Sequence, residues 1–282
     1  NDQILINGYH FGGTSLASDE DFTSANLAAG IIGSSGLADF NEIQLEKMLS
    51  GKNVNISPYI RELSEGISGS SSPKDFETAL QLVYLYFTQP RKDPDIWQSN
   101  ITQTKSLLAN RSLDPTSVFQ DTVSSTLSNH NFRRMVTTVE RLNSASLDKA
   151  YAFYKQRFAD ANGFTFVLVG SFDVDKIQSL LEKYLGGLPS SGGNETYKDL
   201  GIHIPAGQLT KEVHKGIGDK SSVQLVFSGP FEYSDANNLQ INALTEVLNI
   251  KLIERLREKE GGVYAPGVRS NTAKLPNGRY SI

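Results

Sequence analysis

The stretch from Pro189 to Gly201 constrains the fold more than any other feature of the chain. It contains a run of serine, glycine and asparagine and few apolar residues, a composition typical of a linker between domains. A chain of 282 residues is long enough for two ordinary domains. We therefore predict a first domain over residues 1–188, a linker over 189–201 and the beginning of a second, incomplete domain over 202–282.

Strand and helix signals alternate through the first predicted domain, because apolar residues recur at steps of two, three and four and turn residues separate the runs. Ser72-Pro73, Asp93-Pro94 and Asp114-Pro115 each combine a capping side chain with a proline suited to a first helical turn. The expected elements up to residue 72 are a strand over 3–14, a helix over about 22–32, a short helix from a cap at Asp39 with Glu42 to Gly51, two strands within 53–68 and a turn at 69–72. Helices are then expected after each of the three proline signals and after Ser146. They are followed by a strand over 163–170 that is buried on both faces and by a helix from Asp173 to Gly186.

The second predicted domain repeats the strand, strand, helix opening of the first. We expect a strand near 209–217, a strand in which Val223, Leu225 and Phe227 share one face, a helix over about 235–258 and a strand over 263–268. A duplicated α+β fold is the architecture that this order favours.

Charge and the absence of cysteine exclude several classes of function. The net charge of −4 gives no basic surface for a nucleic acid, and no apolar run is long enough to span a membrane. Without cysteine there is no disulfide, thiolate metal site or catalytic thiol. The closest two of the four histidines are eleven residues apart, so no pair of histidines shares a helical turn as a zinc-binding helix requires.

Arg257 and Tyr264 are the candidate catalytic residues. They flank the glycine pair that we expect to end the long helix, so a guanidinium and a phenol could converge there. Such a pair of donors can bind a peptide carbonyl or stabilise an oxyanion. The alternative is structural, because Arg near a helix C-terminus also complements the helix dipole.

The segment Leu256–Tyr264 resembles one in the C-terminal half of the pitrilysin/insulinase zinc metallopeptidases, or inverzincins, where an Arg and a Tyr lie seven residues apart. Residues 163–189 resemble the strand, helix and Gly-x-Leu-Pro segment that closes a unit in this family, and residues 89–93 resemble a loop between two of its helices. The resemblance covers essentially the whole chain.

This resemblance implies four related α/β units, each with a mostly antiparallel sheet covered by helices, in two halves that close like a clamshell. The family binds zinc in its first unit through an H-x-x-E-H helix and a further Glu, whereas residues 25–32 of this chain contain neither histidine nor glutamate. Residues 1–188 therefore resemble the third, non-zinc unit and 202–282 the start of the fourth. We expect this segment to bind no metal and to be inactive alone, with zinc bound by an N-terminal half that precedes Asn1.

The function implied by the resemblance is that of an endopeptidase or oligopeptidase whose Arg257 and Tyr264 hydrogen-bond the substrate carbonyl. Arg255 fits less well, because it lies nine residues from Tyr264. The expected partners are a peptide or small-protein substrate and the zinc-binding half, in the same chain or in a partner subunit. The alternatives are a non-catalytic subunit of a two-chain peptidase and a non-enzymatic relative, such as the core proteins of the cytochrome bc complex. The lack of cysteine permits a bacterial periplasmic or envelope location, with the cytoplasm as the alternative.

Overall fold

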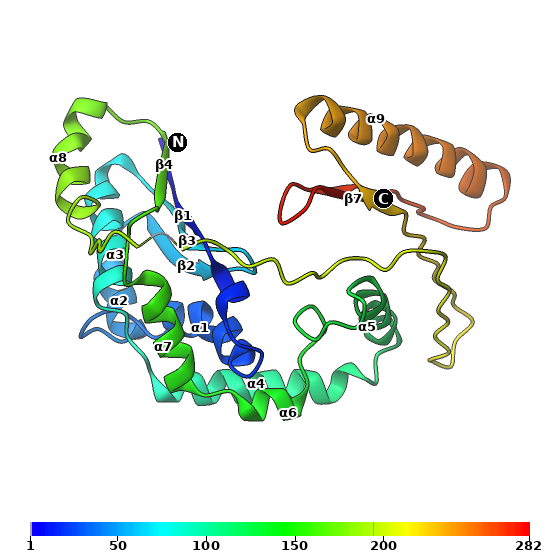
Figure 1. The fold of residues 1–282 in the computed structure, drawn as a ribbon, viewed down its shortest axis with the longest axis horizontal. Coiled ribbons are helices and arrows are strands. Elements are labelled where there is room, and N and C mark those ends of the chain that lie inside the picture. The colour runs from blue at the N-terminus through cyan, green and yellow to red at the C-terminus, as the bar shows by residue number, and fades with distance from the viewer. Residues whose placement is uncertain (1, 194) are drawn as a thin grey trace. The chain divides into compact units, whose positions relative to one another are not determined.

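In the computed structural model, residues 2–193 and 195–282 are described, and the chain divides into two compact units (Figure 1). Unit 1 ends at Lys215, and unit 2 comprises Gly216–Ile282. No helix among the described residues is both long and apolar enough to cross a membrane.

Unit 1 is built on a four-stranded antiparallel sheet. Its strands are β1 (Ile4–Phe11), β2 (Val54–Ile60), β3 (Ser64–Ser71) and β4 (Thr165–Gly170), in the order β2-β3-β1-β4. The turn predicted at 69–72 is wrong, because β3 continues to Ser71. Gly69 pairs so closely with β2 that a Cβ there would lie 1.9 Å from the carbonyl oxygen of Asn55, so glycine serves here for close strand approach and not for a turn.

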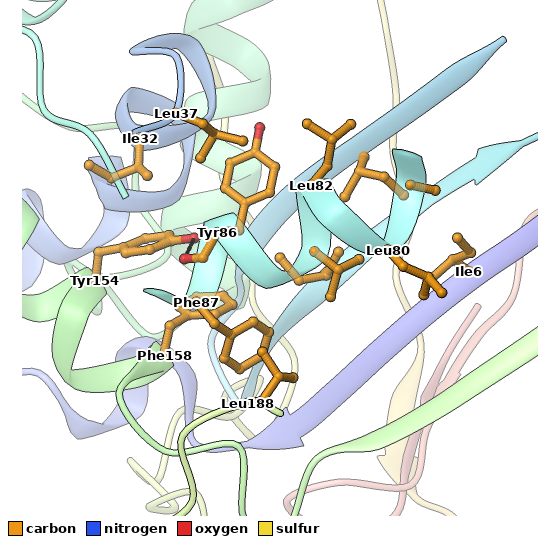
Figure 2. Packing of buried hydrophobic residues seen from close by; sticks show 14 of the residues in the cluster. Ile6, Ile32, Leu37, Leu80, Leu82, Tyr86, Phe87, Tyr154, Phe158 and Leu188 are labelled. Carbon is orange, nitrogen blue, oxygen red and sulfur yellow. Dashed lines mark hydrogen bonds between the residues drawn. The ribbon is translucent and has the colours of Figure 1, made fainter. Parts of the chain in front are cut away.

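Helices cover the inner face of this sheet, toward which buried residues alternate with exposed ones along β1 and β2. The covering helices are α1 (Phe22–Ser34), α3 (Phe76–Thr88), α7 (Leu147–Phe158) and α8 (Val174–Tyr184). Figure 2 shows the centre of the core, where the Phe87 and Phe158 rings meet edge to face at 5.2 Å. The buried Tyr154 hydroxyl donates to the carbonyl of Tyr86 at 3.2 Å, so the one polar group of this side chain is satisfied.

The other helices of unit 1 begin at capping residues. They are α2 (Glu42–Leu49), α4 (Pro94–Arg111), α5 (Pro115–Leu127) and α6 (Val139–Ser144), with short 3-10 turns at Gly13–Leu16 and Pro73–Asp75. Asp93 and Asp114 cap α4 and α5, which confirms the two Asp-Pro signals. The cap predicted at Asp39 with Glu42 is wrong. The capping box starts two residues after Asp39, at Asn41. The Gln44 amide donates to the Asn41 side chain at 2.9 Å, and the Asn41 amide donates to the Gln44 side chain at 3.0 Å. The sequence patterns did not predict α6.

Strand β4 does not lie where the sequence placed it. We expected a central strand buried on both faces, but β4 is at the edge of the sheet, and its Val167 and Val169 are 43% and 58% exposed. The inward-facing Phe166 and Leu168 pack against the core. A continuous apolar run is compatible with burial on both faces but does not say whether a second layer is present.

Unit 2 consists of short strands and one long helix. The strands β5 (Ser228–Pro230), β6 (Asn271–Ala273) and β7 (Arg279–Ser281) form an antiparallel sheet in the order β5-β7-β6. The helix α9 (Asp235–Leu252) continues through the wider π-helical turns of Ile253–Lys259, in agreement with the helix predicted over 235–258. The α+β class with a mostly antiparallel sheet is thereby confirmed.

The strands predicted near 209–217, over 223–227 and over 263–268 are wrong, because none of these described segments is a strand. Val223 and Leu225 are 85% and 73% exposed. Among the described residues 223–227, the backbone of Phe227 alone forms hydrogen bonds with the backbone of another segment, at Ile282. Alternation of apolar residues makes a strand only where a neighbouring strand can pair with its backbone.

Candidate functional site

The C-terminal end of α9 carries both candidate catalytic residues. Past Leu252 the helix widens into π-helical turns, a form that often marks functional sites. Gly261, with φ of 63°, reverses the chain, and the Gly262 amide donates back to the carbonyl of Leu256 at 3.1 Å. The glycine pair therefore ends the helix as the sequence predicts, because the left-handed conformation at the first of them suits glycine.

Three asparagines on one face of α9 bind the chain that returns from this loop. Asn249 holds Val268 at both backbone groups, accepting from its amide at 2.7 Å and donating to its carbonyl at 3.1 Å. Asn238 accepts from the Thr272 hydroxyl at 2.8 Å, and Asn242 lies 3.5 Å from the Ser270 hydroxyl. This asparagine ladder fixes where the returning chain runs along α9. Both candidate residues lie between Asn249 and Val268, Arg257 in the π-helical turns and Tyr264 in the irregular segment after them.

Arg257 and Tyr264 are both exposed and are not joined to each other. The Arg257 side chain is 51% exposed, and its Nε and Nη2 atoms donate to Glu258 at 3.0 and 2.8 Å. Tyr264 is 92% exposed and lies between the helix and β6, in residues without regular structure. No hydrogen bond connects the two side chains in the described structure, so their catalytic role stays a prediction.

Charges of both signs surround Arg257. Arg255 pairs with Glu260 at 2.8 Å, and Lys251 pairs with Glu254 at 3.2 Å. Because these ion pairs are exposed to solvent, the attraction within each pair is weak. The guanidinium of Arg257 is therefore available to exchange Glu258 for another acceptor, such as a carbonyl or carboxylate oxygen.

The residues described here do not fit a zinc ion. The resemblance places α1 at the position of the family's zinc-binding helix, and the buried positions of α1 are Ser24, Ala25, Ala28, Ala29, Ile31 and Ile32. No group of three or more histidine, aspartate or glutamate side chains in the described part of the chain is arranged to hold a metal. What the described residues at the end of α9 offer chemically is hydrogen-bond donors, the Arg257 guanidinium and the Tyr264 hydroxyl.

A buried charged cluster in unit 1 was not predicted from the sequence. Glu65 accepts from the Gly13 amide and from His10 Nδ1 at 3.0 Å, and the guanidinium of Arg157 lies 3.9 Å away. The sequence did contain an indication that Glu65 is buried. Side chains two residues apart in a strand share a face, so Glu65 lies on the same inward face of β3 as Ile67.

The comparisons with known proteins agree with this architecture. Residues 144–279 match the family model described as "Peptidase M16 inactive domain". These residues are similar to M16 peptidase inactive domains. The resemblance to the pitrilysin/insulinase family is thereby confirmed, and the matched segment includes Arg257, Tyr264 and the whole of α9.

Two curated relatives extend the match over nearly the whole chain. It is 26% identical over 280 residues to "Zinc protease PQQL-like" of Arabidopsis thaliana, covering 95% of this chain and 26% of the relative. It is 22% identical over 266 residues to "Probable zinc protease PqqL" of Haemophilus influenzae, covering 93% of this chain and 28% of the relative. The chain thus spans about a quarter of the length of these relatives.

Solved structures share the fold. The periplasmic protease PqqL from Escherichia coli superimposes with a TM-score of 0.79 at 18% identity, over 100% of this chain and 31% of that chain. A mutant of the ferredoxin protease FusC, in complex with Arabidopsis ferredoxin, superimposes with a TM-score of 0.74 at 13% identity, over 100% of this chain and 30% of that chain. A peptidase M16 inactive domain from Pseudomonas fluorescens gives 0.70 at 14%, over 99% and 68%.

Proposed function

We propose that this segment is the substrate-contacting part of a zinc-dependent endopeptidase or oligopeptidase, and that its Arg257 and Tyr264 hydrogen-bond the backbone carbonyls of a bound peptide. The observation that carries the proposal is the placement of two exposed donors just past α9, Arg257 in the π-helical turns and Tyr264 in the irregular segment that follows, inside a domain related to zinc proteases. The metal-binding residues would come from the rest of the protein, because the residues described here do not fit zinc.

The expected substrates are peptides or small proteins. Exposed donors at the end of a helix can bind any backbone carbonyl, so they would recognise the main chain more than a particular side chain. One protein of the same fold has been solved with ferredoxin bound, which supports a small protein as substrate. A periplasmic or envelope location is part of the proposal, supported by the periplasmic neighbour from Escherichia coli. Fractionation of cells that contain the full-length protein checks it, and recovery with the cytoplasmic fraction would contradict it.

Arg257→Ala and Tyr264→Phe in the full-length protein test the assignment. Loss of a donor that stabilises a developing oxyanion lowers kcat/KM by roughly 10²-fold. We expect a fall of this order for each variant, measured on a fluorogenic peptide, with unchanged thermal unfolding because both side chains are exposed.

Arg255→Ala is the matched control. It removes a neighbouring exposed arginine with an equivalent ion pair, and it should hydrolyse the peptide at the parent rate. The assignment is wrong if the Arg257 and Tyr264 variants also keep the parent rate. A full-length protein with no peptidase activity at all would instead favour a subunit or a non-enzymatic relative.

A further inference from the structure

The stretch that the sequence suggests as a linker is fastened to unit 1. The Ala161 amide donates to the carbonyl of Pro189 at 2.7 Å, just after the short turn that follows α8. The Asp160 carboxylate then accepts from the backbone amides of Ser191 and Gly193, each at 3.1 Å. These bonds come from the loop that follows α7, so the first part of the stretch is held against that loop.

The next contact involves a buried charge. Arg157, at the end of α7, has a side chain only 1% exposed, and its Nη2 atom forms an ion pair with Glu195 at 2.7 Å. Its nearest other carboxylate is Glu65, at 3.9 Å, and Glu65 already accepts from His10 and Gly13. Glu195 is therefore the closer of the two carboxylates that face this guanidinium. A buried charge that loses its partner is strongly destabilising, so the pairing favours keeping Glu195 in place.

Contacts continue beyond Glu195. The Tyr197 ring meets Phe11 of β1 edge to face at 5.8 Å. The Lys198 amide donates to the hydroxyl of the buried Ser15 at 3.0 Å, and that hydroxyl in turn donates to the carbonyl of Gly12 at 2.6 Å. Ile202 is only 5% exposed. Contacts of four kinds, ionic, polar, aromatic and apolar, thus hold this stretch on unit 1.

We propose that residues 189–193 and 195–202 form a strap latched onto unit 1 through the pair Glu195–Arg157, and that the connection to unit 2 begins only after Ile202. The latch is a conformational device. When it is closed, the chain leaves unit 1 at a fixed point, and when it opens, the strap is added to the connecting segment. Glu195 is 58% exposed while Arg157 is buried, so opening of the latch moves the exposed carboxylate and leaves the guanidinium in the core, 3.9 Å from Glu65.

Glu195→Gln in the 282-residue chain tests the latch. Glutamine keeps the size of the side chain and removes the charge, and a charge-assisted hydrogen bond contributes about 1.5 kcal/mol or more, which is roughly a tenfold change in an equilibrium. We expect the Lys198 amide to exchange with deuterium about tenfold faster in the variant. The Ile67 amide in β3 should keep its parent rate, which separates local opening of the strap from unfolding of unit 1.

Glu212→Gln provides the matched control. Glu212 lies in the segment of the chain between the strap and β5 and pairs with the exposed His214 at 3.4 Å, so its loss should leave Lys198 unchanged. The proposal is overturned if Glu195→Gln leaves Lys198 exchange at the parent rate. It is also overturned if Lys198 of the parent exchanges as fast as the exposed residues around Val223.

Discussion

Asp160 illustrates how one side chain can organise a loop. The Ser191 hydroxyl, together with the backbone amides of Asn162, Ser191 and Gly193, lowers the pKa of the Asp160 carboxyl to about 2. The contribution of Asp160 to stability is then fully present above its unfolded pKa of about 3.9 and is lost as the pH falls toward 2. We predict a carboxyl titration midpoint near 2 by NMR. A midpoint at or above about 3.9 would show that the loop does not bind the carboxylate.

Single residues were predictable where their role is local. The helix cap at Asp114 and the chain reversal at Gly261 follow from side chains and backbone preferences that act within a few positions. The partnership of Arg157 with Glu195, and that of His10 with Glu65, joins residues far apart in sequence, which no spacing rule reveals. For the same reason the sequence could propose Arg257 and Tyr264 as a pair but could not say how near each other they lie.

At the scale of the element, the start of α2 offers a direct test of its cap. Asn41→Ala removes the side-chain acceptor for the Gln44 amide and should lower the free energy of unfolding by about 1 kcal/mol. Asn41→Asp keeps an acceptor at the same place and should remain close to the parent. Asp39→Ala, at the position that the sequence favoured, should also have little effect. Urea unfolding measures all three, and equal losses for Asp39→Ala and Asn41→Ala would contradict the observed box.

Helices could be predicted from this sequence better than strands could. A helix satisfies its backbone within its own residues, so periodicity and caps locate α3, α4, α5 and α8. A strand depends on partners elsewhere in the chain. The apolar run of β4 was therefore recognised as a strand but placed at the wrong position in the sheet, and the alternating residues of 223–227 do not form a strand.

At the scale of the whole molecule, the segment between the strap and β5 should be the first to be cut by a protease. Residues 203–227 contain no helix or strand, and Lys211, Lys215 and Lys220 are exposed there. We predict that brief trypsin treatment cleaves after these lysines and leaves a fragment with the far-ultraviolet circular dichroism of a folded unit 1. Mass spectrometry identifies the cuts, and initial cleavage after Lys155 in α7 would contradict the expectation.

The α+β plan was accessible from the sequence because strand and helix signals alternate along it, and the resemblance to M16 peptidases supplied the rest. The extent of each unit was harder to predict. Contacts assign residues up to Lys215 to unit 1, whereas composition suggested a boundary before residue 202. Composition shows which residues avoid a core, but a polar stretch can still be held by hydrogen bonds and ion pairs.

The asparagine ladder on α9 bears on how this domain can change in evolution. Asn238 and Asn249 bind the returning chain at Thr272 and Val268. These hydrogen bonds hold β6 in position on α9, and with it the pairing of β6 with β7. Side-chain changes among residues 253–267 fall outside these bonds and need not shift any strand. The segment that carries Arg257 and Tyr264 can therefore change around these two residues while the strands to which it returns keep their pairing.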